Sequence, residues 1–237
     1  MDIKYILKDF IRTFPDVNKF IENRLFTLDH KGYKAINTKH ISHVISYGIK
    51  YNIRDLNMDI LKQVHEEYNF DDIQQDDVVL DVGANRGYFS IYMSKMAEHV
   101  YSVEPFFIDE LNDNIAMNQA AENITVFPFA LSNDDFEMEV RGRTTICKGK
   151  PFNELLEMCG TQIDFLKCDC EGGEWNIKPD DLSGIRRIEM EIHSFNGENM
   201  YEMVNMIKEE GFNVIINDRD KTTMLLHAFR KLSCGNA

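Results

Sequence analysis

The chain has 237 residues, of which 43% are hydrophobic and 28% are charged, proportions typical of a globular protein. No apolar run approaches the roughly 20 residues that a membrane-spanning helix needs, so neither disorder nor membrane spanning is its dominant character. Its 26 Lys and Arg residues stand against 40 Asp and Glu, and the net charge of -14 disfavours an ordinary nucleic-acid binder because it repels phosphodiester backbones.

The start of the chain and its cysteines both indicate a reducing compartment. The first residues, MDIKYILKDFIRTF, mix acids with bases and lack the positive start and apolar stretch of a secretory signal. The 5 cysteines are odd in number and contain no CxxC pair, which is typical of reduced thiols and not of a zinc site or disulfide framework. We therefore expect a cytoplasmic protein.

Apolar residues recur at helical spacing through residues 1–70 and predict an N-terminal extension of amphipathic helices. The pattern includes Ile3, Ile6, Leu7, Phe10, Ile11, Phe20, Ile21, Leu25, Ile41, Val44, Ile45, Leu56, Ile60, Leu61 and Val64. Pro15 and Gly32 interrupt it. We divide the chain into two parts. The first is this helical extension, which is expected to be a cap, acceptor or interface region, and the second is a domain over residues 71–237.

The extension contains one stretch of unusual charge. Residues 31–54 contain five bases and no acid: Lys31, Lys34, Lys39, Lys50 and Arg54. Charge concentrated against the overall sign can attract an anionic ligand. The alternative is a solvated face, or one docked on the acidic remainder of the chain.

The domain over residues 71–237 alternates strands with helices. We expect strands at 78–82, 99–103, 124–129, 163–169 and 186–193, with helices at 88–97, 108–121, 152–158 and 198–210. A hairpin is predicted near Phe136–Val140. The last two strands, 212–217 and 222–229, are joined by a short turn, which forces an antiparallel pair because parallel strands need a long crossover.

A turn with the residues of a ligand site follows the first of these strands. Asp81, Gly83, Asn85 and Gly87 lie in DVGANRGYF, where glycines allow positive φ and the N–H groups of the next helix can donate to an anion. Glu104 ends the next strand, 23 residues after Asp81, where an acid binds ribose hydroxyls in doubly wound nucleotide folds.

Two classes of nucleotide ligand compete for this turn. A dinucleotide oxidoreductase favours GxGxxG, but Asn85 stands at the second glycine position and Arg86 precedes Gly87. Asp81 suits a ligand end that bears an ammonium group, as S-adenosylmethionine does. The residues favour S-adenosylmethionine without excluding a dinucleotide.

Five segments appear in order over residues 77–193: VVLDVGANRGYFSIYMSK, VYSVEPF, ITVFPFALSN, IDFLKCDCEGGEW and RRIEMEIH. Together they resemble the FkbM-type S-adenosylmethionine-dependent methyltransferases. The most specific piece matches the pattern Lys-x-Asp-x-Glu-Gly-x-Glu with Lys167, Asp169, Glu171, Gly172 and Glu174. Cys168 and Cys170 replace the usual aliphatic residues, and Gly173 stands where Ala is common.

The resemblance implies an α/β class I methyltransferase fold, with a Rossmann-like seven-stranded sheet and an antiparallel last strand. It also implies S-adenosyl-L-methionine as cofactor and methyl transfer to an oxygen of a small molecule or sugar. The expected cofactor-binding residues are Asp81, Gly83, Ala84, Asn85, Gly87, Tyr88, Phe89, Glu104, Pro105, Phe106, Ala130, Leu131 and Asp169. Residues 1–70 lie outside the resemblance.

Three residues are candidates for catalysis. Asp169 ends the fourth strand, at the edge where ligands bind in open α/β sheets, and Lys167 shares its face and can neutralise it. His193 ends the fifth strand. Because imidazole has a pKa near neutral, we expect His193 to be the general base that deprotonates the acceptor hydroxyl.

Other roles stay open. Asp169, Glu171 and Glu191 could instead hold a divalent cation that lowers the pKa of the acceptor, although no metal site is predicted. Glu171 and Glu174 could also be carboxylates that stabilise a helix start. The alternative functions are an N-methyltransferase or a module that binds the cofactor without turnover. The expected partner is a small-molecule or glycan acceptor, with nucleic acid and membrane excluded and a homo-oligomer left open.

Overall fold

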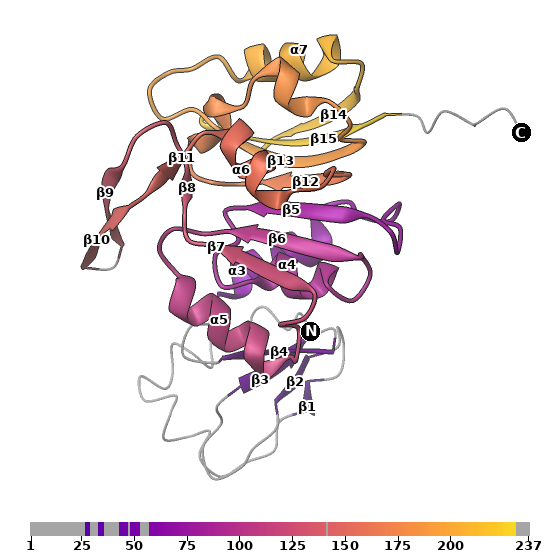
Figure 1. The fold of residues 1–237 in the computed structure, drawn as a ribbon, viewed down its shortest axis with the longest axis vertical. Coiled ribbons are helices and arrows are strands. Elements are labelled where there is room, and N and C mark those ends of the chain that lie inside the picture. The colour runs from indigo at the N-terminus through magenta and orange to yellow at the C-terminus, as the bar shows by residue number, and fades with distance from the viewer. Residues whose placement is uncertain are drawn as a thin grey trace, which may run out of the picture. The chain divides into compact units, whose positions relative to one another are not determined.

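The computed structural model describes residues 27–28, 33–35, 43–46, 48–52, 57–140 and 142–230 (Figure 1). The chain divides into two units between Asn57 and Met58. Among the described residues, no helix has the length and apolar character needed to cross a membrane.

The first unit contains a four-stranded antiparallel sheet in the order β1-β2-β3-β4. The strands are β1 (Thr27–Leu28), β2 (Tyr33–Ala35), β3 (His43–Ser46) and β4 (Ile49–Asn52). The predicted helices are therefore wrong for these segments, and the other residues of 1–56, apart from Gly48, lie outside the described part. The acid-free stretch from Lys31 to Arg54 falls largely among those residues, so its role stays a prediction.

The reason for the error is visible in β4. Ile49 and Tyr51 are buried while Lys50 is exposed, which is the two-residue period of a strand. Gly48, at a φ of 75°, lies between β3 and β4 and allows the tight reversal of a hairpin. In segments this short, a few apolar residues fit helical and strand spacing equally well.

The second unit alternates strands and helices as predicted. Its strands are β5 (Val78–Val82), β6 (His99–Val103), β7 (Ile124–Phe127), β8 (Ala130–Leu131), β9 (Phe136–Val140), β10 (Arg143–Cys147), β11 (Gly149–Lys150), β12 (Phe165–Cys168), β13 (Arg187–His193), β14 (Asn213–Asp218) and β15 (Thr223–Phe229). Its α-helices are α3 (Met58–Glu66), α4 (Tyr88–Met93), α5 (Ile108–Met117), α6 (Phe152–Cys159) and α7 (Met200–Glu209), with 3-10 turns η1 (Gly173–Asn176) and η2 (Pro179–Leu182).

Seven of these strands form one sheet in the order β14-β15-β13-β12-β5-β6-β7 (Figure 1). The neighbours from β13 to β7 are parallel, whereas β15 runs antiparallel to both β13 and β14. A seven-stranded sheet whose last strand is antiparallel confirms the predicted α/β class I methyltransferase fold.

The two faces of this sheet differ in chemistry. One face is apolar: Leu80, Leu166 and Ile188 pack with residues of α6 and α7, such as Leu155 and Val204, in a continuous core. The burial of these side chains supplies the main stabilisation of the unit.

The opposite face carries a row of polar residues. In register across β6, β5, β12, β13 and β15 lie Ser102, Asp81, Lys167, Glu189 and His227. The first four are buried, and the exposed fraction of Glu189 is 0%. Because a buried charge is costly unless it is paired, this row must be satisfied internally.

Helix α3 and the residues that follow it cover part of this polar face. The backbone N–H of Asn69 donates to Glu189, and Arg187 donates to the carbonyl of Asn69 and to Glu189. The helix predicted from Leu61 and Val64 is thus present, and it belongs to the second unit. The unit begins at Met58 and not at the predicted residue 71.

The carboxyl ends of β5 and β12 meet at Gly83. Its φ is 78°, and a Cβ atom there would lie 1.8 Å from the carbonyl oxygen of Asp169. No side chain can be accommodated unless one of the two backbones moves.

We expect Gly83→Ala to lower the free energy of unfolding by at least about 3 kcal/mol, because a left-handed φ and a backbone clash coincide. Gly160→Ala is the matched control, since its φ is 66° but nothing lies within 4 Å of its Cβ position. That variant should lose only about 1 to 2 kcal/mol. Equal losses in chemical denaturation would contradict the proposed clash.

Candidate active site

Asp81 lies at the centre of the site and is fully buried. Ser90 in α4 donates to its Oδ2 over 2.5 Å, and Lys167 Nζ lies 3.2 Å from its Oδ1. The ammonium that Asp81 meets in this structure is therefore that of Lys167. The expectation that Asp81 receives the ammonium of a ligand stays a prediction, and the carboxylate already has a protein partner.

Lys167 links this carboxylate to the turn that follows β5. Its Nζ donates to the carbonyl of Gly83 over 2.8 Å. Burial alone lowers the pKa of Lys167, but the charges of Asp81 and Asp169 outweigh it and raise the pKa above its ordinary value. Lys167 is thus a cation that pairs with Asp81 and contacts the turn at Gly83, and its predicted part in catalysis stays a prediction.

Glu104 follows β6 and holds the turn from the other side. Its Oε2 accepts from the N–H of Asn85 over 2.8 Å, and its Oε1 accepts from the N–H groups of Phe106 and Phe107 over 2.7 and 2.9 Å. Burial raises the pKa of Glu104, and these three hydrogen bonds oppose the rise. The carboxylate is fixed beside the glycine turn, where the sequence predicted the ribose-binding acid.

The side chains around Glu104 form an aromatic and cationic layer. Arg86 lies over the ring of Phe107 at 4.0 Å, and Arg143 lies over the ring of Phe106 at 4.9 Å. Phe106 is buried, whereas Pro105 is half-buried. Packing of Phe106 against an adenine ring stays a prediction, because its contacts here are with the protein.

The remaining predicted cofactor-binding residues are mostly core. Ala84, Tyr88, Phe89, Ala130 and Leu131 are all buried. Phe89 packs on Phe165, with ring centroids 6.0 Å apart. Because these side chains are buried, we expect the residues to contact a ligand through their backbone atoms.

Asp169 follows β12 and faces the covering segment. Its Oδ2 accepts from the hydroxyl of Tyr68 over 2.9 Å and from Gln63 Nε2 over 3.5 Å. Burial and the charges of Asp169 and Glu191 raise the pKa of Tyr68 well above 10.0, so this phenol stays protonated and donates. Gln63 and Tyr68 were not predicted as site residues. The sequence predicts the helix that contains Gln63, but helical spacing does not indicate which distant residue a side chain contacts.

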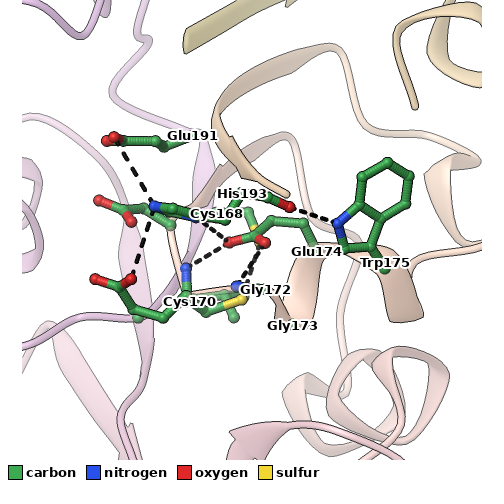
Figure 2. Close-up of polar contacts among 12 residues, drawn as sticks. Cys168, Cys170, Gly172, Gly173, Glu174, Trp175, Glu191 and His193 are labelled. Carbon is green, nitrogen blue, oxygen red and sulfur yellow. Dashed lines mark hydrogen bonds and ion pairs between the residues drawn. The ribbon is translucent and has the colours of Figure 1, made fainter. Parts of the chain in front are cut away.

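The loop after Asp169 is built around a buried carboxylate. Glu174, fully buried in η1, accepts from the N–H groups of Cys170 and Gly172 over 2.8 and 2.9 Å (Figure 2). It also lies 3.3 Å from His193 Nδ1. Glu174 therefore stabilises the turn, as one predicted alternative held, and in addition orients the imidazole.

The environment of His193 favours the protonated imidazole. Burial lowers its pKa, but the hydrogen bond and charge of Glu174, with Asp169 and Glu171, outweigh burial and raise the pKa to about 9. At neutral pH only about one molecule in a hundred would carry a neutral imidazole. The expectation of a near-neutral pKa did not take these carboxylates into account, and the role of His193 as general base stays a prediction.

Two further carboxylates face the same imidazole. Nε2 of His193 lies 3.8 Å from Glu171 Oε2 and 3.9 Å from Glu191 Oε1. Burial raises the pKa of both glutamates, and the charge of Asp169 adds to the rise. The charge of His193 opposes the rise at both glutamates, and that of Arg219 opposes it at Glu191. The site thus combines the glycine turn with a nearby set of carboxylates and one imidazole.

The cysteines of this loop are packed and unreactive. Cys168 and Cys170 are both free, and their Sγ atoms lie 3.7 Å apart. Burial raises the pKa of Cys168, and the hydrogen bond with Cys168 together with burial raises that of Cys170. Both are therefore thiols at neutral pH. They are unreactive because the thiolate is the form of cysteine that reacts.

Comparison with solved structures gives distant likenesses. Precorrin-6y C5,15-methyltransferase from Geobacter metallireducens GS-15 is 13% identical with a TM-score of 0.47, covering 77% of this chain and 94% of its own. Precorrin 8W decarboxylase from Methanobacterium thermoautotrophicum is 16% identical at 0.49, covering 76% and 95%. Magnesium protoporphyrin IX methyltransferase from Synechocystis PCC 6803, with bound SAM, is 13% identical at 0.46, covering 73% and 77%.

No family model and no curated protein matches the sequence. Membership of the FkbM-type family is therefore not confirmed. With every TM-score quoted below 0.5, the likenesses carry no argument about ligands. The fold itself rests on strand order and register.

We expect Lys167→Met to lower the free energy of unfolding by about 3 to 5 kcal/mol, because it leaves Asp81 charged and buried without its cation. Adding Asp81→Asn should restore at least half of that loss, since the amide still accepts from Ser90. Chemical denaturation of the two single variants and the double variant measures this coupling. Strictly additive losses would contradict the ion pair as the source.

Proposed function

We propose that the chain is an S-adenosylmethionine-dependent methyltransferase that methylates a hydroxyl oxygen of a small molecule or sugar. The single observation that supports it most is Glu104, which is fixed at the carboxyl end of β6 by three backbone N–H groups beside the turn from Gly83 to Gly87. In open α/β sheets, ligands bind outside the carboxyl ends of the strands, and an acid there binds the ribose.

The cofactor would lie across the ends of β5, β6 and β12. Glu104 would accept from the ribose hydroxyls, because Oε2 has one donor among the residues that the structure describes and can accept further bonds. The turn would contribute mainly backbone groups, since Ala84 and Tyr88 are buried. Asp169, only partly buried at the end of β12, would lie on the sulfonium side.

In the reaction, a lone pair of the acceptor oxygen forms the new bond to the methyl carbon. The bond between that carbon and sulfur breaks, and its electron pair stays on sulfur, giving S-adenosylhomocysteine. The hydroxyl proton leaves to a base or to water. We propose that Asp169 and His193 face the acceptor and that Lys167 holds the turn in place.

Three finer parts of the proposal rest on sequence alone. FkbM-type membership rests on the motifs from residue 77 to 193, and transfer to oxygen follows from it. An anionic group on the acceptor rests on the acid-free stretch from Lys31 to Arg54. The alternatives are transfer to nitrogen and a module that binds the cofactor without turnover.

Removing the carboxylate of Glu104 should weaken S-adenosylhomocysteine binding by about 10- to 150-fold, the loss of one hydrogen-bonding charge. Glu104→Gln is the variant of choice because it keeps the size of the side chain, and its single amide oxygen can still accept either from Asn85 or from Phe106 and Phe107. Isothermal calorimetry on the full chain measures the affinity, and the melting temperature shows whether the turn survives.

The control is Glu157→Gln, which removes the same charge from an exposed position on α6. Its affinity should equal that of the parent. Parental affinity in Glu104→Gln would contradict the ribose site, and saturable binding of NADH with none of S-adenosylhomocysteine would favour the oxidoreductase. Transfer of a labelled methyl group from S-adenosylmethionine to hydroxyl or amine acceptors separates the oxygen and nitrogen alternatives.

A further inference from the structure

Three side chains with metal-ligating atoms converge at the carboxyl ends of β12 and β13. One ligand atom each from Asp169, Glu171 and His193 lies within 4.8 Å of the others. A cation with bonds of about 2.2 Å holds ligands no more than roughly 4.4 Å apart. Because the side chain of Glu171 is 70% exposed, a small rotation suffices to close the set.

The imidazole of His193 is held in the orientation that a metal ligand needs. Glu174 contacts Nδ1, and Trp175 Nε1 donates to the backbone carbonyl of His193 over 2.6 Å (Figure 2). A ligating histidine commonly donates its other ring N–H to a carboxylate, which fixes the tautomer and aims the free nitrogen. Glu174 is fully buried and fixed by two backbone N–H groups, so it is a rigid support.

The other ring nitrogen faces the carboxylates without a hydrogen bond. The side chain of His193 is only 8% exposed, and in the described part of the chain Nε2 forms no hydrogen bond and lies 3.8 Å from Glu171 and 3.9 Å from Glu191. These distances are too long for hydrogen bonds. A polar atom of a side chain more than nine-tenths buried thus faces the cluster.

The neighbouring carboxylates are not equally available. Glu191 is occupied, because Arg219 donates to both of its oxygens and Gln63 donates to Oε2. The donors to Asp169 among the described residues reach Oδ2, and none of them reaches Oδ1. Of the described residues around Nε2 of His193, Asp169 and Glu171 therefore complete a set of three ligand atoms with the imidazole, and Glu191 contributes negative charge nearby.

We propose that Asp169, Glu171 and His193 bind a divalent cation, and that the acceptor hydroxyl coordinates to it; the second part rests on the proposed function. Two carboxylates and one imidazole suit a first-row cation such as Mn²⁺. Three protein ligands leave coordination positions for water and for the acceptor oxygen. The cation would lower the pKa of the bound hydroxyl, which removes the need for a histidine base.

The test measures Mn²⁺ binding to the chelator-treated full chain, without turnover. Electron paramagnetic resonance should show one saturable site per chain, and spin-echo modulation should show coupling to one imidazole nitrogen. Glu171→Gln, a change at an exposed position, should weaken Mn²⁺ at least about 10-fold. His193→Gln should abolish the nitrogen coupling, and Glu157→Gln should leave both measurements unchanged.

Three results would overturn the site: no saturable Mn²⁺ below about 1 mM, a parental affinity in Glu171→Gln, or nitrogen coupling that persists in His193→Gln. Calorimetry with S-adenosylhomocysteine on the same samples separates this proposal from the proposed function. Cofactor binding without Mn²⁺ binding rejects the cation site alone. Mn²⁺ binding without cofactor binding supports the cation site and rejects the methyltransferase.

Discussion

The buried ion pair between Asp81 and Lys167 is the interaction on which the rest of the site depends. It joins the two central strands β5 and β12 in register, and the same ammonium donates to the carbonyl of Gly83. A buried pair is costly to break, because either partner alone leaves an uncompensated charge. The turn that would hold the cofactor and the strand end that carries Asp169 therefore have a fixed relation, set by one contact beneath both.

The pair is part of a wider division of labour between the faces of the sheet. The face under α6 and α7 is apolar and supplies stability. The other face concentrates ionisable side chains, which α3 and the residues after it satisfy through Gln63, Tyr68 and Asn69. The ionisable side chains are thus confined to the face where protein groups already pair them. They can contact a ligand where the strands end.

The sequence was sufficient for the α/β alternation, the antiparallel last strand and the positions of Glu104, Asp169 and His193, because each follows from local periodicity or a strand end. It was insufficient for contacts between distant segments. Nothing local pairs Gln63 with Asp169, and the raised pKa of His193 comes from carboxylates on another segment of the chain. The short strands between Thr27 and Asn52 were not predicted for a different reason. Segments with so few residues fit the helical period and the strand period equally well.

The position of α3 has a consequence for where the chain can be cut. Cleavage between Asn57 and Met58 would leave the cover of the polar face attached to the strands that it protects. Cleavage after Phe70 would remove the donors of Gln63, Tyr68 and Asn69 at once, and so expose Asp169 and Glu189 to water together. Limited proteolysis at the first position would therefore yield a C-terminal fragment whose polar face stays covered. Limited proteolysis at the second position would yield a C-terminal fragment that is prone to unfold or associate.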